Sequence, residues 1–146
     1  MITVREMLAA KRNNLIQRVA PTTTVRDAAQ IMNEAGTGSV LVEDAGKVVG
    51  IFTERDLMRR VVAADKLPGA TTVGDVMTTA LVSALPDATL ADCGQLMSER
   101  RIRHLPVFDG DHVIGIVTTG DLLAHELAEK AAKIQHLEDF VFYTRS

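Results

Sequence analysis

The chain of 146 residues has a formal net charge of −3, with 47% hydrophobic and 24% charged residues, a balance typical of globular domains. Its negative charge argues against non-specific binding to nucleic acid, which requires dense positive charge. No apolar run reaches the roughly 20 residues of a membrane helix, and residues 1–10 lack the basic start and apolar core of a secretory signal. Cys93 is the only cysteine, so we expect no internal disulfide and a cytoplasmic protein.

Turn residues and apolar periodicity in the first half predict a strand, a helix, two strands and a second helix. Thr24 has the chemistry of a helix N-cap, and Gly36 has the backbone freedom that ends a helix. The expected elements are a strand at 15–19, a helix ending at Gly36, strands at 39–42 and 47–52, and a helix at 53–62.

The second half repeats this order. Residues 19–58 align with residues 84–123 without a gap, and fourteen positions are identical. The expected elements are a helix from Thr89, strands at 104–108 and 112–117, and a helix from Thr118. Two copies are too few for a solenoid. The predicted fold class is therefore α+β, with two pseudo-symmetric β-α-β-β-α units packed through their sheets and a cleft between them.

The repeat extends upstream with one change. Residues 3–8 resemble residues 72–77 at an offset of 69 rather than 65. The first copy therefore carries four additional residues within Ala9–Asn14, in a polar stretch.

The segment after Asp121 continues as a helical pattern. Its apolar stripe consists of Leu123, Leu127, Ala131, Ile134, Leu137 and Val141. Two interpretations remain open: the helix folds back on its own domain, or it packs on a second subunit.

Each copy places a Thr-x-x-Asp motif between a strand and a helix, at Thr53–Asp56 and at Thr118–Asp121. One interpretation is a capping box, in which the threonine and the acidic residue satisfy backbone N–H groups. The other is a nucleotide site, because N–H groups at a helix start attract phosphate and a carboxylate accepts hydrogen bonds from ribose hydroxyls. The two interpretations are compatible.

These motifs resemble those of paired cystathionine-β-synthase (CBS) domains, which sense adenosine-containing ligands. The matching segments are GIFTERD at 50–56, GIVTTGD at 115–121 and RHLPV at 103–107. The resemblance covers most of the chain and implies a tandem CBS-domain pair. We place the first CBS domain at 1–66, the second at 67–124, and a C-terminal helix and tail at 125–146.

The resemblance also implies which residues hold the ligand. Ribose and phosphate would be held by Asp56, Thr53, Asp121 and Thr118. The adenine would be held by Leu15, Ile16, Gln17, Thr37, Gly38 and Ser39 in one copy, and by Thr78, Val82 and Ile102 in the other. The candidate phosphate clamps are Arg103, His104 and Arg55, of which arginine is the better bidentate donor.

The two copies differ at these sites. Arg103 and His104 stand where the first copy has Gly38 and Ser39. The inserted stretch around Lys11–Asn14 lies near one cleft. We therefore predict two sites of different affinity, one of which can be empty.

We expect a non-enzymatic regulatory module that binds one adenosine-containing ligand. AMP is the first candidate, and ADP, ATP, NAD(H) and S-adenosylmethionine are the others. CBS pairs generally dimerise, so a homodimer and an unidentified downstream protein are the expected partners, without nucleic acid or membrane. No catalytic cofactor or metal is expected, because the four histidines lack metal-site spacing and Cys93 aligns with Ala28 on a buried helix face. Two alternatives remain. The first is an enzyme-related protein, either a regulatory subunit of an enzyme or a nucleotide hydrolase. The second is a structural dimerisation module without ligand.

Overall fold

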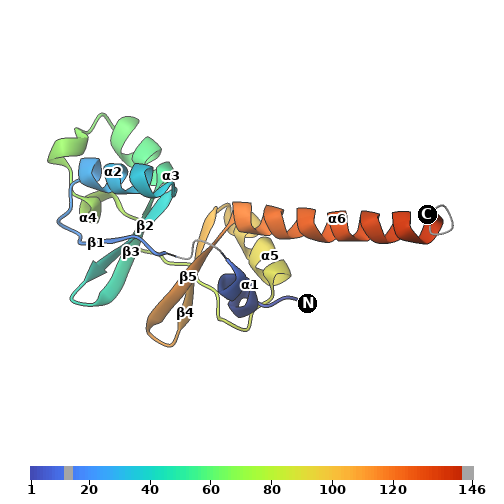
Figure 1. Ribbon diagram of the computed structural model, residues 1–146. Coiled ribbons are helices and arrows are strands. Elements are labelled where there is room, and N and C mark those ends of the chain that lie inside the picture. Colours follow the sequence, from blue (N-terminus) through green and yellow to red (C-terminus); the bar gives the residue numbers. More distant parts are fainter. Residues whose placement is uncertain (12–14, 143–146) are drawn as a thin grey trace.

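The computed structural model describes residues 1–11 and 15–142, and its two halves lie side by side (Figure 1). Residues 12–14 of the inserted stretch lie outside the described part. The first half contains β1 (Arg18–Val19), α2 (Val25–Ala35), β2 (Ser39–Asp44), β3 (Lys47–Thr53), α3 (Glu54–Asp56) and the π-helical segment η1 (Leu57–Val62). The second half contains α5 (Leu90–Arg100), β4 (His104–Asp109), β5 (His112–Thr118) and α6 (Thr119–Phe142). The predicted order of helices and strands is largely confirmed.

The β2–β3 and β4–β5 hairpins pair their strands in the same register. In the first half β2 pairs with β3 in antiparallel fashion, and the register shifts between Val42 and Glu43. In the second half β4 pairs with β5, and the register shifts at the equivalent point, between Val107 and Phe108. A bulge at the same place in both hairpins shows that the repeat extends to the irregular positions of the backbone.

The first strand of each unit is shorter than the sequence predicts. The strand expected at 15–19 is reduced to β1, which runs parallel to β2 with Val19 opposite Val42. Its counterpart in the second half is an isolated parallel bridge between Ala84 and Val107. Alanine has a lower strand propensity than valine, which fits the shorter pairing in the second half.

The core of each half is completed by a helix that belongs to the other repeat. Helix α1 (Val4–Ala10) contributes Val4, Met7 and Leu8 to the apolar core of the second half. Helix α4 (Val73–Val76) contributes Val73 and Val76 to the core of the first half. The two helices therefore exchange places between the halves and join them into one body.

The exchange is fixed by matching backbone hydrogen bonds. The Val4 N–H donates to the Ala88 carbonyl over 2.8 Å, and the Val73 N–H donates to the Thr23 carbonyl over 2.8 Å. The segment after α4 then reaches β3, where the N–H of Thr78 donates to the carbonyl of Ile51 over 2.8 Å. The start of the second repeat therefore lies against the sheet of the first.

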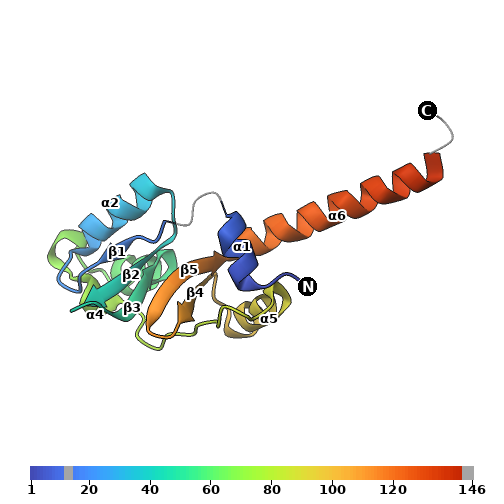
Figure 2. The same cartoon turned by 60° about the horizontal axis from the view of Figure 1, so that its bottom comes forward.

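Helix α6 does not fold back on its own domain. It extends away from both halves in the two views (Figures 1 and 2), and only its beginning packs on α5. Leu123, Leu127, Ile134 and Leu137 of its apolar stripe are all more than half exposed. In the described part of the chain, no helix has the length and apolar character needed to span a membrane.

Candidate functional site

The first Thr-x-x-Asp corner lies where β3 meets α3. The backbone N–H of Thr53 donates to Asp56 Oδ2 over 3.0 Å, and the N–H of Asp56 donates to Thr53 Oγ1 over 3.3 Å. This is a complete capping box, and Asp56 is buried. The capping interpretation of the motif is confirmed here. The capping box uses Asp56 Oδ2, so Oδ1 can accept hydrogen bonds from other groups.

The second corner repeats this geometry where β5 meets α6. The N–H of Thr118 donates to Asp121 Oδ2 over 2.9 Å, and the N–H of Asp121 donates to Thr118 Oγ1 over 3.1 Å. The two corners therefore have the same backbone and differ in what approaches the carboxylate.

A hydroxyl from the second repeat approaches Asp56. Thr78 Oγ1 donates to Asp56 Oδ1 over 3.0 Å. Arg60 Nε stands 3.7 Å from the same oxygen, while its guanidinium donates to the Met77 carbonyl over 2.9 Å. This corner is thus built from both repeats.

An ammonium from the first repeat approaches Asp121. Lys11 Nζ lies 3.0 Å from Asp121 Oδ2 and donates also to the Ile116 carbonyl over 3.2 Å. The sequence placed the inserted stretch near one cleft but did not identify Lys11 as a partner of Asp121. The offset of the repeat changes within this stretch, so no aligned residue in the other copy indicated the contact.

A cavity of about 550 Å³ lies beside the first corner. Eight of the predicted site residues line it: Thr53, Arg55, Asp56, Thr78, Val82, Ile102, Arg103 and His104. Its volume falls within the range of roughly 300–1,000 Å³ that is usual for small-molecule sites. The sequence missed Glu54, Arg59, Arg60 and Leu81, which also line it. Leu81 aligns with Ile16 at the repeat offset, and that alignment is the signal that could have found it.

The charge around this cavity is strongly positive for a chain of net charge −3. Its lining includes four arginines, Arg55, Arg59, Arg60 and Arg103, against the two carboxylates of Glu54 and Asp56. Arg55 is held in place across the halves, because its Nη1 donates to the carbonyl of Arg101 over 2.6 Å. Such a cluster favours an anionic ligand.

The remaining predicted residues belong to the first half. The carbonyl of Gln17 accepts from the N–H of Leu41 over 2.9 Å, and Thr37 Oγ1 lies 3.5 Å from the Ser39 carbonyl. At the repeat offset, Ile16, Gln17, Thr37, Gly38 and Ser39 correspond to Leu81, Val82, Ile102, Arg103 and His104. They are therefore the counterparts, for the corner at Asp121, of residues that line the cavity at Asp56.

Ser39 has an unusual environment. It is 3% exposed, and its hydroxyl has no hydrogen-bond partner among the described residues. Successive side chains of a strand point to opposite faces, and the neighbouring Val40 belongs to the core of the first half. Ser39 therefore faces away from that core.

His104 and Glu54 meet over Gly38. A Cβ at Gly38 would lie 2.8 Å from Glu54 Cδ and 3.0 Å from His104 Nε2, so glycine leaves the space that both side chains use. Burial lowers the pKa of His104 below its ordinary 6.5, and Arg103 and Lys11 lower it further. The carboxylates of Glu54 and Asp121 act in the opposite direction. The imidazole is therefore held toward its neutral form at the junction of the halves.

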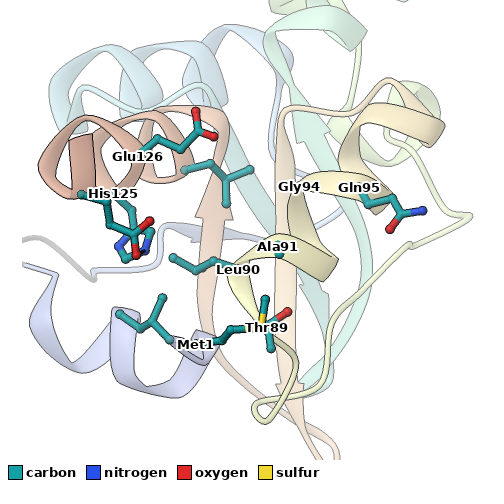
Figure 3. A pocket seen from close by; sticks show the side chains of 11 residues that line it. Met1, Thr89, Leu90, Ala91, Gly94, Gln95, His125 and Glu126 are labelled. Atoms are coloured by element: carbon teal, nitrogen blue, oxygen red, sulfur yellow. Dashed lines mark ion pairs between the residues drawn. The ribbon is translucent and has the colours of Figure 1, made fainter. Parts of the chain in front are cut away.

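A second cavity, of about 480 Å³, lies at the base of α6. Its side chains come from the chain start at Met1, from α5 and from α6 (Figure 3). Its lining includes Glu126 and the contact between His125 Nε2 and Glu129 Oε1 at 3.2 Å. None of the predicted site residues lines this cavity, and its carboxylates oppose the binding of phosphate.

Within residues 1–11 and 15–142, no group of three or more His, Cys, Asp or Glu side chains is placed to hold a metal ion. Cys93 is buried in the core of the second half, and burial raises the pKa of its thiol. A buried thiol with a raised pKa is a poor nucleophile.

Comparison with known proteins agrees with this architecture. The sequence profile of the CBS domain matches residues 12–63 and 73–128. The CBS domain-containing protein YhcV of Bacillus subtilis is 36% identical over 117 residues, which cover 80% of this chain and 83% of YhcV. The mitochondrial CBS domain-containing protein CBSX3 of Arabidopsis thaliana is 32% identical over 123 residues, which cover 81% of this chain but only 60% of CBSX3.

Solved structures show the same fold. A CBS-domain protein from Burkholderia ambifaria MC40-6 superposes with a TM-score of 0.84 at 39% identity, covering 87% of this chain and 95% of that protein. The two halves described above, each with its hairpin and corner, are therefore a tandem pair of a known kind.

Proposed function

This chain belongs to the CBS-domain family, and we propose that it is a non-enzymatic regulatory module that binds an adenosine-containing ligand between its halves. AMP is the first candidate, followed by ADP, ATP, NAD(H) and S-adenosylmethionine. The single Cys93, which is buried, is compatible with the reducing cytoplasm, where we place the protein.

The observation that carries this proposal is the cavity beside Thr53 and Asp56. Asp56 supplies a carboxylate suited to a ribose diol. The surrounding arginines supply the charge-assisted donors that bind phosphate. Leu81, Val82 and Ile102 supply an apolar surface for a base. These three kinds of group at one cavity match the three parts of a nucleotide.

The regulatory step follows from where the cavity lies. Its lining includes Thr53 and Asp56 of the first half and Arg103 and His104 of the second. A ligand that contacts both halves favours the arrangement in which both contacts are made. The change that a downstream protein reads is limited to the difference in affinity of the ligand for the two arrangements.

We also propose that the protein self-associates as a homodimer through α6. The four exposed apolar side chains of this helix, Leu123, Leu127, Ile134 and Leu137, support a contact with a second copy. A structural neighbour with 22% identity is described as the hexameric CBS-CP12 protein, and it supports the fold alone. Sedimentation analysis of Leu127→Asp tests the proposal: the variant should be a monomer at concentrations where the unchanged protein is a dimer.

Titration calorimetry with AMP tests the ligand. Asp56→Asn should abolish measurable heat, because the amide presents one acceptor atom where the carboxylate presents two. Asp92→Asn is the matched control, since Thr89 and Asp92 form the same capping box at the start of α5, outside the cavity. It should bind AMP as the unchanged protein does. Native mass spectrometry of the freshly purified protein would identify a co-purified ligand.

Other outcomes would favour the alternatives. If Asp56→Asn and Asp92→Asn lose similar amounts of stability and neither the variants nor the unchanged protein binds a nucleotide, the corners are caps only and the module is structural. If bound nucleotide is converted to product on incubation, the protein is an enzyme.

A further inference from the structure

We infer that Lys11 decides which of the two clefts takes the ligand, because its ammonium occupies the carboxylate of Asp121 that would otherwise hold a ribose. This inference rests on the proposed nucleotide function and adds to it the residue that separates the two sites. The cleft at Asp56 is the open one, and the cleft at Asp121 is closed by the chain itself.

The geometry of the closed corner carries the inference. Lys11 Nζ stands 3.0 Å from Asp121 Oδ2, the same oxygen that accepts the Thr118 N–H over 2.9 Å. The side chains of Lys11 and Asp121 are 22% and 16% exposed. The pair is therefore screened less than a surface ion pair, and both hydrogen bonds end on Oδ2 of Asp121.

The open corner is different in kind. Its carboxylate meets the neutral hydroxyl of Thr78, which can turn to accept from or donate to a ligand. Among the described residues, the cation recorded in an ion pair with this carboxylate is Arg60, whose Nε is 3.7 Å from Asp56 Oδ1 and whose guanidinium also donates to the Met77 carbonyl. A ribose at Asp56 therefore competes with a hydroxyl at 3.0 Å and a guanidinium at 3.7 Å, whereas a ribose at Asp121 competes with an ammonium at 3.0 Å.

The length of α1 places Lys11 at this position. Helix α1 has seven residues and its counterpart α4 has four. Val4, Met7 and Leu8 hold α1 on the core of the second half, and the Lys11 N–H donates to the Leu8 carbonyl over 3.3 Å as the helix ends. Lys11 therefore starts from a fixed backbone, which lowers the entropy lost when its side chain pairs with Asp121.

Titration calorimetry of the 146-residue chain with AMP tests the inference in the unchanged protein and three variants. The unchanged protein should bind one AMP per chain, and Asp56→Asn should bind none. Lys11→Met keeps the aliphatic stem and removes the charge, so it should gain a second site, with affinity raised by roughly tenfold or more over that of the unchanged protein at this cleft. The double variant Asp56→Asn/Lys11→Met should regain one AMP per chain, now at Asp121.

Two further variants keep the result interpretable. Lys47→Met removes the same charge from the exposed start of β3, and it should leave the stoichiometry at one. Lys11→Gln serves as a second substitution, with the thermal unfolding of each variant measured to confirm folding.

The outcomes separate the two proposals. If the unchanged protein binds one AMP, Asp56→Asn binds none, and neither Lys11 variant gains a site, the inference about Lys11 is overturned and the proposed function stands. If none of the proteins binds AMP or another adenosine ligand, the proposed function falls, and the inference falls with it. Recovery of binding in the double variant supports both.

Discussion

The two halves of this protein have nearly the same backbone and different chemistry at the same place. Both close a strand-to-helix corner with a threonine and an aspartate, and both complete that corner with a side chain from the other repeat. In the first half that side chain is the hydroxyl of Thr78, and in the second it is the ammonium of Lys11. The comparison shows that residues shared by the repeats fix the shape of the corner, while residues near the interruption of the repeat differ in the group that they place beside its carboxylate.

The largest effect is expected where the halves exchange helices. Leu8 lies in the core of the second half and is 5% exposed, so Leu8→Ala should destabilise the protein by about 2–4 kcal/mol. Denaturant unfolding should still show one transition, because each core contains a helix from the other repeat. Leu85→Ala, at a position 71% exposed, should leave stability nearly unchanged. Separate transitions for the two halves would contradict this account of a single body.

The next prediction concerns the approach of the second repeat to β3. A Cβ at Gly50 would lie 2.8 Å from the carbonyl oxygen of Thr78, a backbone atom that cannot turn away. Gly50→Ala should therefore cost about 1–3 kcal/mol in thermal unfolding. It should also weaken AMP binding, since it displaces the segment that carries Thr78 to Asp56.

Gly69→Ala is the control for this substitution. A Cβ at Gly69 would meet no atom within 4 Å. Its stability should be equal to or slightly above that of the unchanged protein. If Gly50→Ala is as stable as Gly69→Ala, the close packing of the repeats at this point is not what requires glycine.

A smaller effect is expected from pH. Burial holds the pKa of His104 below 6.5, so just below that pH the unfolded chain binds a proton that the folded chain does not. The free energy of unfolding should therefore decrease as the pH falls below 6.5 and should not depend on His104 above it. Ser39 occupies the same position in the other half, so the first half has no such dependence. His104→Gln should reduce the slope of stability against pH, and an unchanged slope would contradict the assignment.

The smallest predicted effect is at the ends of two equivalent helices. Helix α2 ends at Gly36 with φ of 65°, and helix α5 ends at Arg101 with φ of 53°. The left-handed conformation is strained for arginine and not for glycine. Arg101→Gly should therefore stabilise the protein by about 0.5–1 kcal/mol, and Gly36→Ala should destabilise it by a similar amount. Differential scanning calorimetry of Arg101→Gly and Gly36→Ala measures these two effects. Equal stability of Arg101→Gly and the unchanged protein would show that Arg101 is not strained.

Local patterns in the sequence predicted much of the fold. Thr24 begins α2, Gly36 ends it, and both hairpins lie close to their expected residues. The two capping boxes also follow from spacing alone, because a threonine and an aspartate three residues later are close in any helix start. The resemblance to CBS domains then grouped residues such as Val82 and Ile102 that line one cavity.

The remainder depends on contacts between distant segments, which local patterns do not contain. Helices α1 and α4 each bury a few apolar residues, and nothing local in their sequences assigns those residues to one half or the other. The contact between Lys11 and Asp121 joins residues 110 apart, on either side of the interrupted repeat. Met58 lies in the segment predicted as a helix at 53–62, and only the structure shows that it is 56% exposed and lines the cavity.

The exchange of helices sets the order in which the protein can be completed during synthesis. Domains generally fold from the N-terminus as the chain emerges from the ribosome. The core of the first half is complete only after Val73 and Val76 have been synthesised. The residues of α1 pack in a core whose members extend to Val117, so α1 can pack fully only after that residue has been synthesised. Such non-local contacts slow folding. The apolar face of α1, which is made before the second half, therefore stays uncovered until Val117 has been made.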